Sequence, residues 1–436
     1  MATQTPTPST PTPSALTPSA LTTGSRALAP DLARGVMLLL IALANTPWYL
    51  YATTTSTSSI HPTDGSTLDR VVQFAIITTV DSRVYPMFAF LFGYGIVQMY
   101  QRSLDRGAEP QAVRRVLRRR HLWMIAIGFL HAALLWMGDI VGAYGIVGLI
   151  FTAAFLQRRD KTLLVWAGVL TGLLTLAAIA ATVGSVFAAQ APPPAEADGF
   201  LAWIKDINGI EFWLASILPR LMIWVFLLAF QGLLSLVIPI AVLLAFWAAR
   251  HRVLDEPDRH RRLLTAVAVV GIVVGWGGGG VHALQHVGVL PIPDHVSWVF
   301  ATTQPLTGLF GGLGYVALFG LVAAALARRG PTVGPVTTAV TAVGKRSLSA
   351  YLVQSVLCAP LLSAWGLGLG AVLGSAGAAA LAIGVWLVTL TGCALLERRG
   401  RRGPAEWMLR RLAYGRSAGS SPALRRSPCS TDLPAA

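Results

Sequence analysis

The chain has 436 residues, of which 54 % are hydrophobic and 12 % are charged, and its mean hydropathy is +0.62. So few charged side chains cannot cover the surface of a soluble fold, whose charged share is about 25 %. The net charge of +15 would suit a nucleic-acid partner in a soluble protein. Apolar runs long enough to cross a bilayer recur along the chain, however. The composition excludes a soluble enzyme, a secreted disulfide module and a nucleic-acid binder, and it predicts an all-α, polytopic membrane protein.

The two ends of the chain differ from the rest. Residues 2–25 are rich in Thr, Pro, Ser and Ala and contain no aromatic and no acidic residue, so they cannot bury enough apolar surface to fold. They also lack the basic n-region of a signal peptide. We predict disordered cytoplasmic tails at 1–26 and 417–436, with a membrane domain over 27–416.

Between the tails the hydropathy predicts about ten spanning helices. They are 34–51, 84–100, 121–138, 140–157, 162–188, 214–249, 263–280, 306–327, 345–365 and 372–396. The segment 214–249 is long enough for two crossings. We prefer one crossing, because Trp203, Trp213 and Arg220 indicate that 200–220 lies along the membrane interface.

The distribution of basic residues supports this count. With ten spans and both termini in the cytoplasm, all but four of the 34 Lys and Arg residues lie on the cytoplasmic side. The exceptions are Arg70, Arg83, Lys205 and Arg220. Asp and Glu divide almost evenly, as expected of residues that contribute little to topology. The basic excess therefore reflects topology, together with attraction to anionic lipid in the bilayer.

Ionisable side chains at membrane depth are functional candidates by default. Asp31 and Arg34, three residues apart at the first span, can pair on one helix face, and Arg34 is a donor-binding candidate. A structural anchor is equally expected, because Asp31 follows Pro30 at a helix start. Asn45, near the far end of this span, is a substrate-binding candidate or a partner of a neighbouring helix.

A second group precedes the second span. Arg83 can bind a substrate carboxylate or phosphate, but an ion pair with Asp81 is the preferred interpretation. Pro86 opens a helix well, and Gly93 and Gly95 allow close packing along it.

His131 lies in the third span and Asp139 lies at the turn into the fourth. Their spacing of eight places them on similar faces of a continuing helix, and they can also meet through the turn. A buried imidazole beside a carboxylate is a usable general base. For His131 alone, a hydrogen bond within the bundle is slightly favoured over catalysis.

Four histidines fall in the predicted exterior segments. His282 and His286 have the i, i+4 spacing of helical metal ligands, but no Glu lies between them as in HExxH and no third ligand is assured. The cysteines also lack metal-ligand spacing, so no metal is predicted. His61 lies in a Ser/Thr-rich loop, where a surface position is expected unless other evidence gives it a role.

The ninth predicted span begins with two basic residues. Lys345 and Arg346 suit either a membrane anchor or the phosphates of a donor such as coenzyme A. Tyr351 and Gln354 follow further into the span, need polar partners and are substrate-binding candidates. The sequence contains no GxxxxGKS, HExxH or CxxC motif. The Gly-rich stretch 275–280 follows no predicted strand, so it is a packing or hinge feature.

Four stretches together resemble a known family. They are Asp31–Gly35 with Asn45, then Tyr85–Gly95, then Arg119–Asp139, and last Gly344–Ser355 followed by Gly403–Trp407 and Leu412–Tyr414. This ordered set resembles the YeiB-like family of bacterial inner-membrane proteins, which is defined by domain of unknown function 418. That family is placed by similarity among transmembrane acyltransferases.

The resemblance implies an acyl donor, expected to be acyl-CoA, that is reached from the cytoplasm, and a sugar or envelope-polymer acceptor on the far side. No bound cofactor is implied. The mechanism would be general-base activation of the acceptor or a histidine acyl intermediate. In acyltransferase-three proteins a catalytic histidine lies near the end of span one, where this chain has Asn45. Lysosomal glucosaminide acetyltransferases also have Asn there and a later histidine, so His61 and His131 compete for the role of base.

Three functions remain open from the sequence. The first is a plasma-membrane acyltransferase that uses His131 or His61. The second is a transporter of a small metabolite or lipid-like compound, which the long exterior loops and Gly-rich helices would suit, although the hydropathy shows no inverted repeat. The third is a membrane scaffold without catalysis.

Overall fold

The computed structural model describes residues 28–56, 58–192, 200–329 and 334–414. The predicted disordered tails, 1–26 and 417–436, lie outside the described residues. Within the described ranges every named element is a helix, and an isolated β-bridge joins Thr55 to Pro62. The prediction of an all-α fold is confirmed.

In the described part of the chain, six helical stretches are long and apolar enough to cross a membrane. They are α1 (Leu28–Asn45) with its 3-10 extension (Thr46–Tyr49), α2 (Thr67–Thr79) with α3 (Val84–Leu104), α6 (Asp160–Ala188), α10 (Arg261–His286), α11 (Val299–Arg328) and α14 (Ser375–Arg398). Four shorter apolar helices accompany them. They are α5 (Val141–Ala154), α8 (Ile217–Ala229), α9 (Val237–Arg250) and α13 (Ser347–Leu362). The protein is a multi-pass membrane protein.

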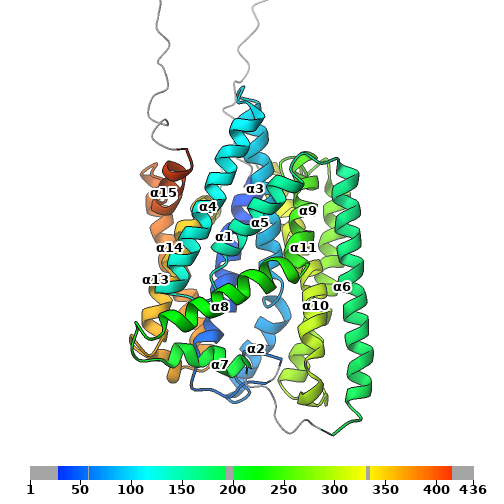
Figure 1. Cartoon of the computed structure of the whole chain (residues 1–436), viewed down its shortest axis with the longest axis vertical. Helices are drawn as coiled ribbons and strands as arrows, with labels where there is room; N and C mark the ends of the chain where they lie inside the picture. Colours follow the sequence, from blue (N-terminus) through cyan, green and yellow to red (C-terminus); the bar gives the residue numbers. More distant parts are fainter. Residues whose placement is uncertain (1–27, 57, 193–199, 330–333, 415–436) are drawn as a thin grey trace, which may run out of the picture.

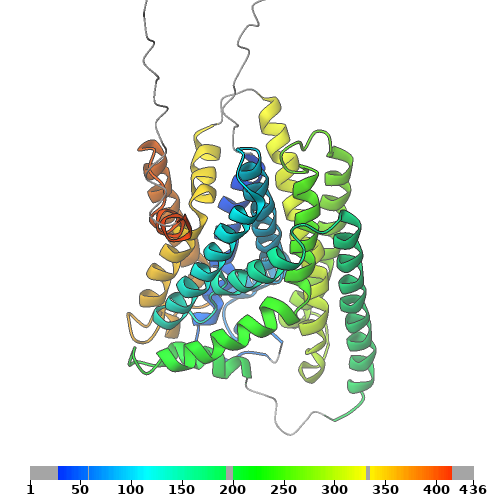
Figure 2. The ribbon, with the colours of Figure 1, turned by 45° about the horizontal axis from the view of Figure 1, so that its top comes forward.

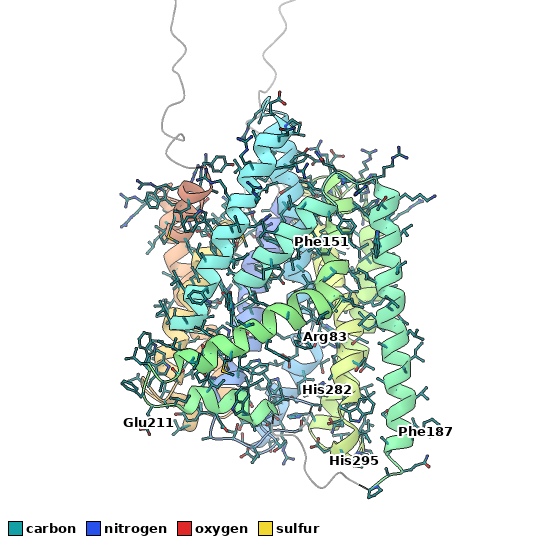
Figure 3. All side chains as sticks on the ribbon, viewed as in Figure 1. Arg83, Phe151, Phe187, Glu211, His282 and His295 are labelled. Atoms are coloured by element: carbon teal, nitrogen blue, oxygen red, sulfur yellow. The ribbon has the colours of Figure 1, made fainter. Side chains whose placement is uncertain are left out.

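The remaining helices are α4 (Pro110–Leu134), whose first half is rich in arginine, and three short ones: α7 (Phe200–Asp206), α12 (Pro335–Lys345) and α15 (Pro404–Tyr414). Each of the ten predicted segments coincides with helix in the structure. The described chain begins and ends at the same end of the bundle, which we call the basic end (Figures 1 and 2). Glu211 and His295, both predicted to be exterior, lie at the opposite end (Figure 3). That the basic end faces the cytoplasm stays a prediction.

The segment 214–249, for which we preferred a single crossing, contains two helices in the structure, and the number of crossings stays a prediction. α8 runs obliquely across the bundle and α9 turns away from it (Figure 1). A π-helical turn (Phe230–Leu234) follows α8, and Leu236 then adopts a φ of +60°, which helical backbone does not tolerate. Hydropathy does not report such a break, because both helices are apolar.

Packing separates inner from outer helices. Most of α9 is buried in the main core, against α3. α6 stands at the outer edge (Figure 1) and exposes large apolar side chains along its length, as expected of a helix that contacts lipid. α10 and α11 pack closely through glycine, because a Cβ on Gly275 would lie 2.6 Å from the Cα of Gly311. The glycine run at 275–280 is therefore a packing feature, as predicted.

Candidate functional site

His131 and Asp139 form a buried hydrogen-bonded pair. α4 ends at Leu134, and the turn into α5 brings Asp139 back toward the imidazole, so that His131 Nδ1 and Asp139 Oδ2 lie 2.7 Å apart. The exposed fractions of the two side chains are 2 % and 0 %. The prediction that these residues can meet is confirmed, and they meet through the turn.

The other oxygen of Asp139 is also held. Oδ1 accepts hydrogen bonds from the backbone N–H of Gly142 at 2.8 Å and from the indole N–H of Trp224 at 3.3 Å. Gly128 makes room for it, because a Cβ at Gly128 would lie 2.4 Å from this oxygen. A carboxylate held by these donors accepts from the Nδ1–H of His131, so the neutral imidazole keeps its lone pair on Nε2.

The Nε2 atom of His131 is buried and has no hydrogen-bond partner among the described residues. The imidazole packs against Tyr351, with 5.2 Å between the ring centroids. The Tyr351 hydroxyl accepts a hydrogen bond from the backbone N–H of Ile140 at 3.4 Å. An imidazole arranged in this way can take a proton from a hydroxyl or amine placed next to Nε2.

A cavity of about 490 Å³ reaches Tyr351 from the basic end, and we call it the basic cavity. Its basic side chains are Arg34, Arg102, Arg106, Arg120, Lys345 and Arg410. The acidic residues in its lining are Asp31 and Glu406. Its aromatic side chains are Phe88, Phe92, Tyr144, Tyr351 and Tyr414. Ligand sites commonly have such a volume, and arginines beside aromatic rings suit a phosphate-bearing anion with a planar ring.

A second, smaller pocket borders Tyr351. Its volume is about 20 Å³, which is room for about one water molecule. Asn45 and Gln354, predicted as substrate-binding residues, line it beside Tyr351. Gln354 also donates to the carbonyl of Leu38 at 3.1 Å, which satisfies the predicted need for a polar partner. Tyr351 is common to the linings of both cavities.

The predicted donor-binding residues differ in whether they line the basic cavity. Arg34 and Lys345 do; Arg34 forms the predicted pair with Asp31 at 3.5 Å, and Lys345 donates to Glu397 at 2.6 Å. Arg346 does not line this cavity. Its guanidinium is buried and donates to Glu397 at 2.6 Å, so Arg346 ties α13 to α14.

Arg83 is fully buried and lines neither cavity. It donates to the Gln304 amide oxygen at 2.7 Å and to the Gly275 carbonyl at 2.5 Å. The preferred ion pair with Asp81 is wrong: Arg83 donates to the backbone carbonyl of Asp81, while the Asp81 carboxylate contacts His61. Gly279 on α10 and Gly311 on α11 leave space for the Arg83 side chain, which packs between these two helices (Figure 3).

His61 is fully buried, so the expected surface position is wrong. Its Nε2 lies 2.8 Å from Asp81 Oδ2, and its ring lies 6.0 Å from that of His286. Lys205 on α7 folds the loop inward by donating to Thr53 Oγ1 at 2.8 Å and to the Ile60 carbonyl. A long-range contact of this kind has no signal in the local sequence.

The exterior histidines do not assemble a metal site. Within the described ranges no group of three or more His, Cys, Asp or Glu side chains is placed to hold a metal ion. His282 Nε2 lies 3.4 Å from Ser58 Oγ, and His286 Nε2 lies 3.2 Å from the Pro62 carbonyl. His282 and His286, both on α10, thus hold the loop that contains Ser58 and Pro62.

Several site residues were missed from the sequence. Trp224, which holds Asp139, comes from α8, and nothing in that apolar helix marks it. Arg120 and Arg410 line the basic cavity, yet in the sequence they were counted only as topological charges. Because both residues lie in arginine-rich segments, the sequence did not distinguish them from charges that only set the topology.

Comparison with known proteins finds similarity to bacterial proteins whose function is not described. Residues 248–416 match the family described as "Protein of unknown function (DUF418)". The uncharacterized protein YeiB of Escherichia coli is 26 % identical over 419 residues, which is 90 % of this chain and 97 % of that protein. The uncharacterized protein YxaH of Bacillus subtilis is 25 % identical over 365 residues, or 77 % of this chain and 80 % of that protein. The chain is thus similar to YeiB-like proteins, and its C-terminal part matches the DUF418 family model.

The family match covers only part of the candidate site. It includes Lys345, Tyr351 and Gln354 but begins after the His131–Asp139 pair. An uncharacterized 39.9 kDa protein of Bacillus acidopullulyticus is 32 % identical over 133 residues, which is 30 % of this chain and 35 % of that protein. The similarity to YeiB extends over both parts of the site, because it covers 90 % of the chain.

Proposed function

We propose that this multi-pass membrane protein is a plasma-membrane acyltransferase. It takes an acyl thioester, such as acyl-CoA, into the basic cavity and passes the acyl group to a hydroxyl or amine of an envelope sugar or polymer. The observation that carries the proposal is the position of Tyr351, which lines both cavities and packs against His131. The resemblance of the chain to transmembrane acyltransferases supplies the reaction class.

The basic cavity would hold the phosphates and the planar ring of the donor. Arginine binds phosphate through paired N–H donors, and Lys345 adds a point charge at the α12–α13 junction. The thioester would then lie against Tyr351, next to His131. The lining of the smaller pocket, with Asn45 and Gln354, offers polar side chains to the acceptor.

In the proposed step, His131 Nε2 removes the proton from the acceptor hydroxyl or amine. The acceptor atom bonds to the acyl carbon, the carbon–sulfur bond breaks, and the imidazolium returns the proton to the departing thiolate. Asp139 stabilises the imidazolium and keeps Nδ1 protonated throughout. General-base catalysis of this kind contributes about 10²- to 10⁴-fold to a rate.

The test is a transfer assay in proteoliposomes with radiolabelled acetyl-CoA and an extracted envelope fraction. Wild-type protein is expected to transfer label to the envelope fraction, and His131→Ala protein, shown to be folded, is expected to lose transfer. His61→Ala serves as the matched control. Loss of transfer in His61→Ala alone would assign the role of general base to His61, which faces Asp81. If folded protein bound the donor but transferred no label, the transporter hypothesis would replace this proposal.

A further inference from the structure

α15 is an amphipathic helix at the membrane boundary. It begins at Pro404, a few residues after α14 ends at Arg398, and α14 is one of the helices able to span a membrane. Its inner face carries Ala405, Leu409 and Ala413, all buried. The spacing of these residues, i, i+4, i+8, places them on one stripe of the helix.

The inner face is held firmly in place. The carboxylate of Glu406 accepts from the backbone N–H groups of Leu348 and Ser349 at 2.8 and 3.0 Å, at the start of α13. On α4, Arg119 donates to the carbonyl of Leu412 at 3.2 Å. α15 is therefore a docked part of the fold, and its single acidic side chain is used on the inner side.

The outer face combines apolar and basic side chains. Trp407 is 54 % exposed, and Met408 and Tyr414 are 38 % and 39 % exposed. Arg411 stacks over Trp407 and Arg410 over Tyr414, each at 5.4 Å from the ring centroid. Aromatic side chains interleaved with arginine on one helix face are typical of helices that lie in the headgroup region of a bilayer.

The surroundings of this face are also positive. α4, which packs against α15, and the α14–α15 connection carry exposed arginines. They are Arg114, Arg115, Arg118, Arg119, Arg401 and Arg402. We propose that the outer face of α15 docks onto anionic phospholipid headgroups of the leaflet at the basic end. Charge complementarity and the direct continuation from α14 select this partner.

This docking affects the basic cavity, because the same helix forms one of its walls. Leu409, Ala413, Arg410 and Tyr414 line the cavity. Two of these, Arg410 and Tyr414, stack on each other and also contribute to the outer face. Anionic lipid docked on the outer face would therefore also hold this wall of the basic cavity in place. The docking itself does not depend on the proposed acyl transfer.

The test is hydrogen–deuterium exchange of 404–414 in nanodiscs that hold one protein copy. Discs of phosphatidylcholine are compared with discs that also contain phosphatidylglycerol. Each basic residue near an anionic surface contributes ~1 kcal/mol. Exchange in α15 is thus expected to slow by about fivefold for each arginine engaged, while exchange in α12 at the same end stays unchanged.

The variant Arg410→Gln with Arg411→Gln is expected to remove the difference between the two lipids. The control Arg261→Gln with Arg262→Gln, at the start of α10, is expected to keep it. Melting temperatures verify that both variants are folded. Equal exchange of wild-type α15 in the two disc types would overturn the proposal. Protection that appears only in discs with two copies would assign the face to a second copy of the chain instead.

Discussion

Within the described residues, two His–Asp pairs have a buried imidazole and a similar hydrogen-bond distance. His131 and Asp139 are 2.7 Å apart, and His61 and Asp81 are 2.8 Å apart. In each pair one imidazole nitrogen faces a carboxylate and the other is buried without a hydrogen-bond partner among the described residues. The carboxylates differ in exposure, 0 % for Asp139 and 26 % for Asp81, but distance and imidazole burial alone do not separate a catalytic pair from a structural one.

The surroundings of the two pairs differ. His131 packs on Tyr351, which lines both the basic cavity and the smaller pocket. None of the four residues of the two pairs lines either cavity, and the neighbours of His61 and Asp81 attach a loop to α7 and α10. A base can act only where a substrate reaches it, so the contact of His131 with the cavity-lining Tyr351 distinguishes the pairs.

The largest expected effect comes from removing each imidazole in turn. His131→Ala is expected to lower kcat for acyl transfer by about 10²- to 10⁴-fold, because the proton acceptor is lost. His61→Ala is expected to keep kcat near the wild-type value and to lower the melting temperature, since it removes a buried side chain and exposes its partner. Transfer kinetics and thermal melts of both variants, measured on the same preparations, decide the comparison. Equal losses of kcat would end the distinction between the pairs.

The next effect concerns the two carboxylates. In Asp139→Asn the new amide can donate to His131 Nδ1 and so favours the tautomer that carries its proton on Nε2, which cannot accept one. We expect kcat to fall by about 10²-fold with little change in the donor KM. Asp81→Asn is the matched change in the other pair and is expected to leave kcat unaltered. A rise in the donor KM without a change in kcat for Asp139→Asn would show that Asp139 only shapes the binding site.

The sequence predicted the helices better than the site. All ten apolar segments are helical, because a hydrocarbon environment leaves the backbone few other ways to satisfy its hydrogen bonds. The contact of His131 with Asp139 was also predictable, since eight residues and one turn separate them. The burial of His61 was not, because Lys205 and His286 hold its loop from distant parts of the chain. Nor did hydropathy reveal the break at Leu236, which is a backbone feature.

A smaller effect, on the donor KM, is expected from the basic residues on the side of the His131–Asp139 pair. Arg34→Gln removes a guanidinium from the basic cavity and is expected to raise the donor KM about tenfold, the equivalent of ~1.4 kcal/mol. Arg346→Gln removes a charge of the same kind outside the cavity. It is expected to lower the melting temperature with an unchanged KM, because Glu397 loses a donor. Donor titrations of transfer rate with both variants check this, and equal KM values for Arg34→Gln and wild type would place the donor elsewhere.

The last expected effect leaves transfer unchanged and lies in the pH dependence of stability near His61. Burial lowers the pKa of Lys205, on α7, to about 8 from the ordinary 10.5. Between these values the unfolded chain binds the proton more tightly than the folded protein does, so stability is expected to rise as pH increases from 8 to 10.5. Lys205→Met, which keeps the stem without the ammonium, should remove this rise, an effect on the order of 1 to 3 kcal/mol. Thermal melts across that pH range measure it, and the same slope in wild type and variant would mean that Lys205 does not hold the His61 loop as a buried cation. Lys205→Met is not expected to affect the His131–Asp139 pair, so kcat measured at a fixed pH is expected to be unaltered.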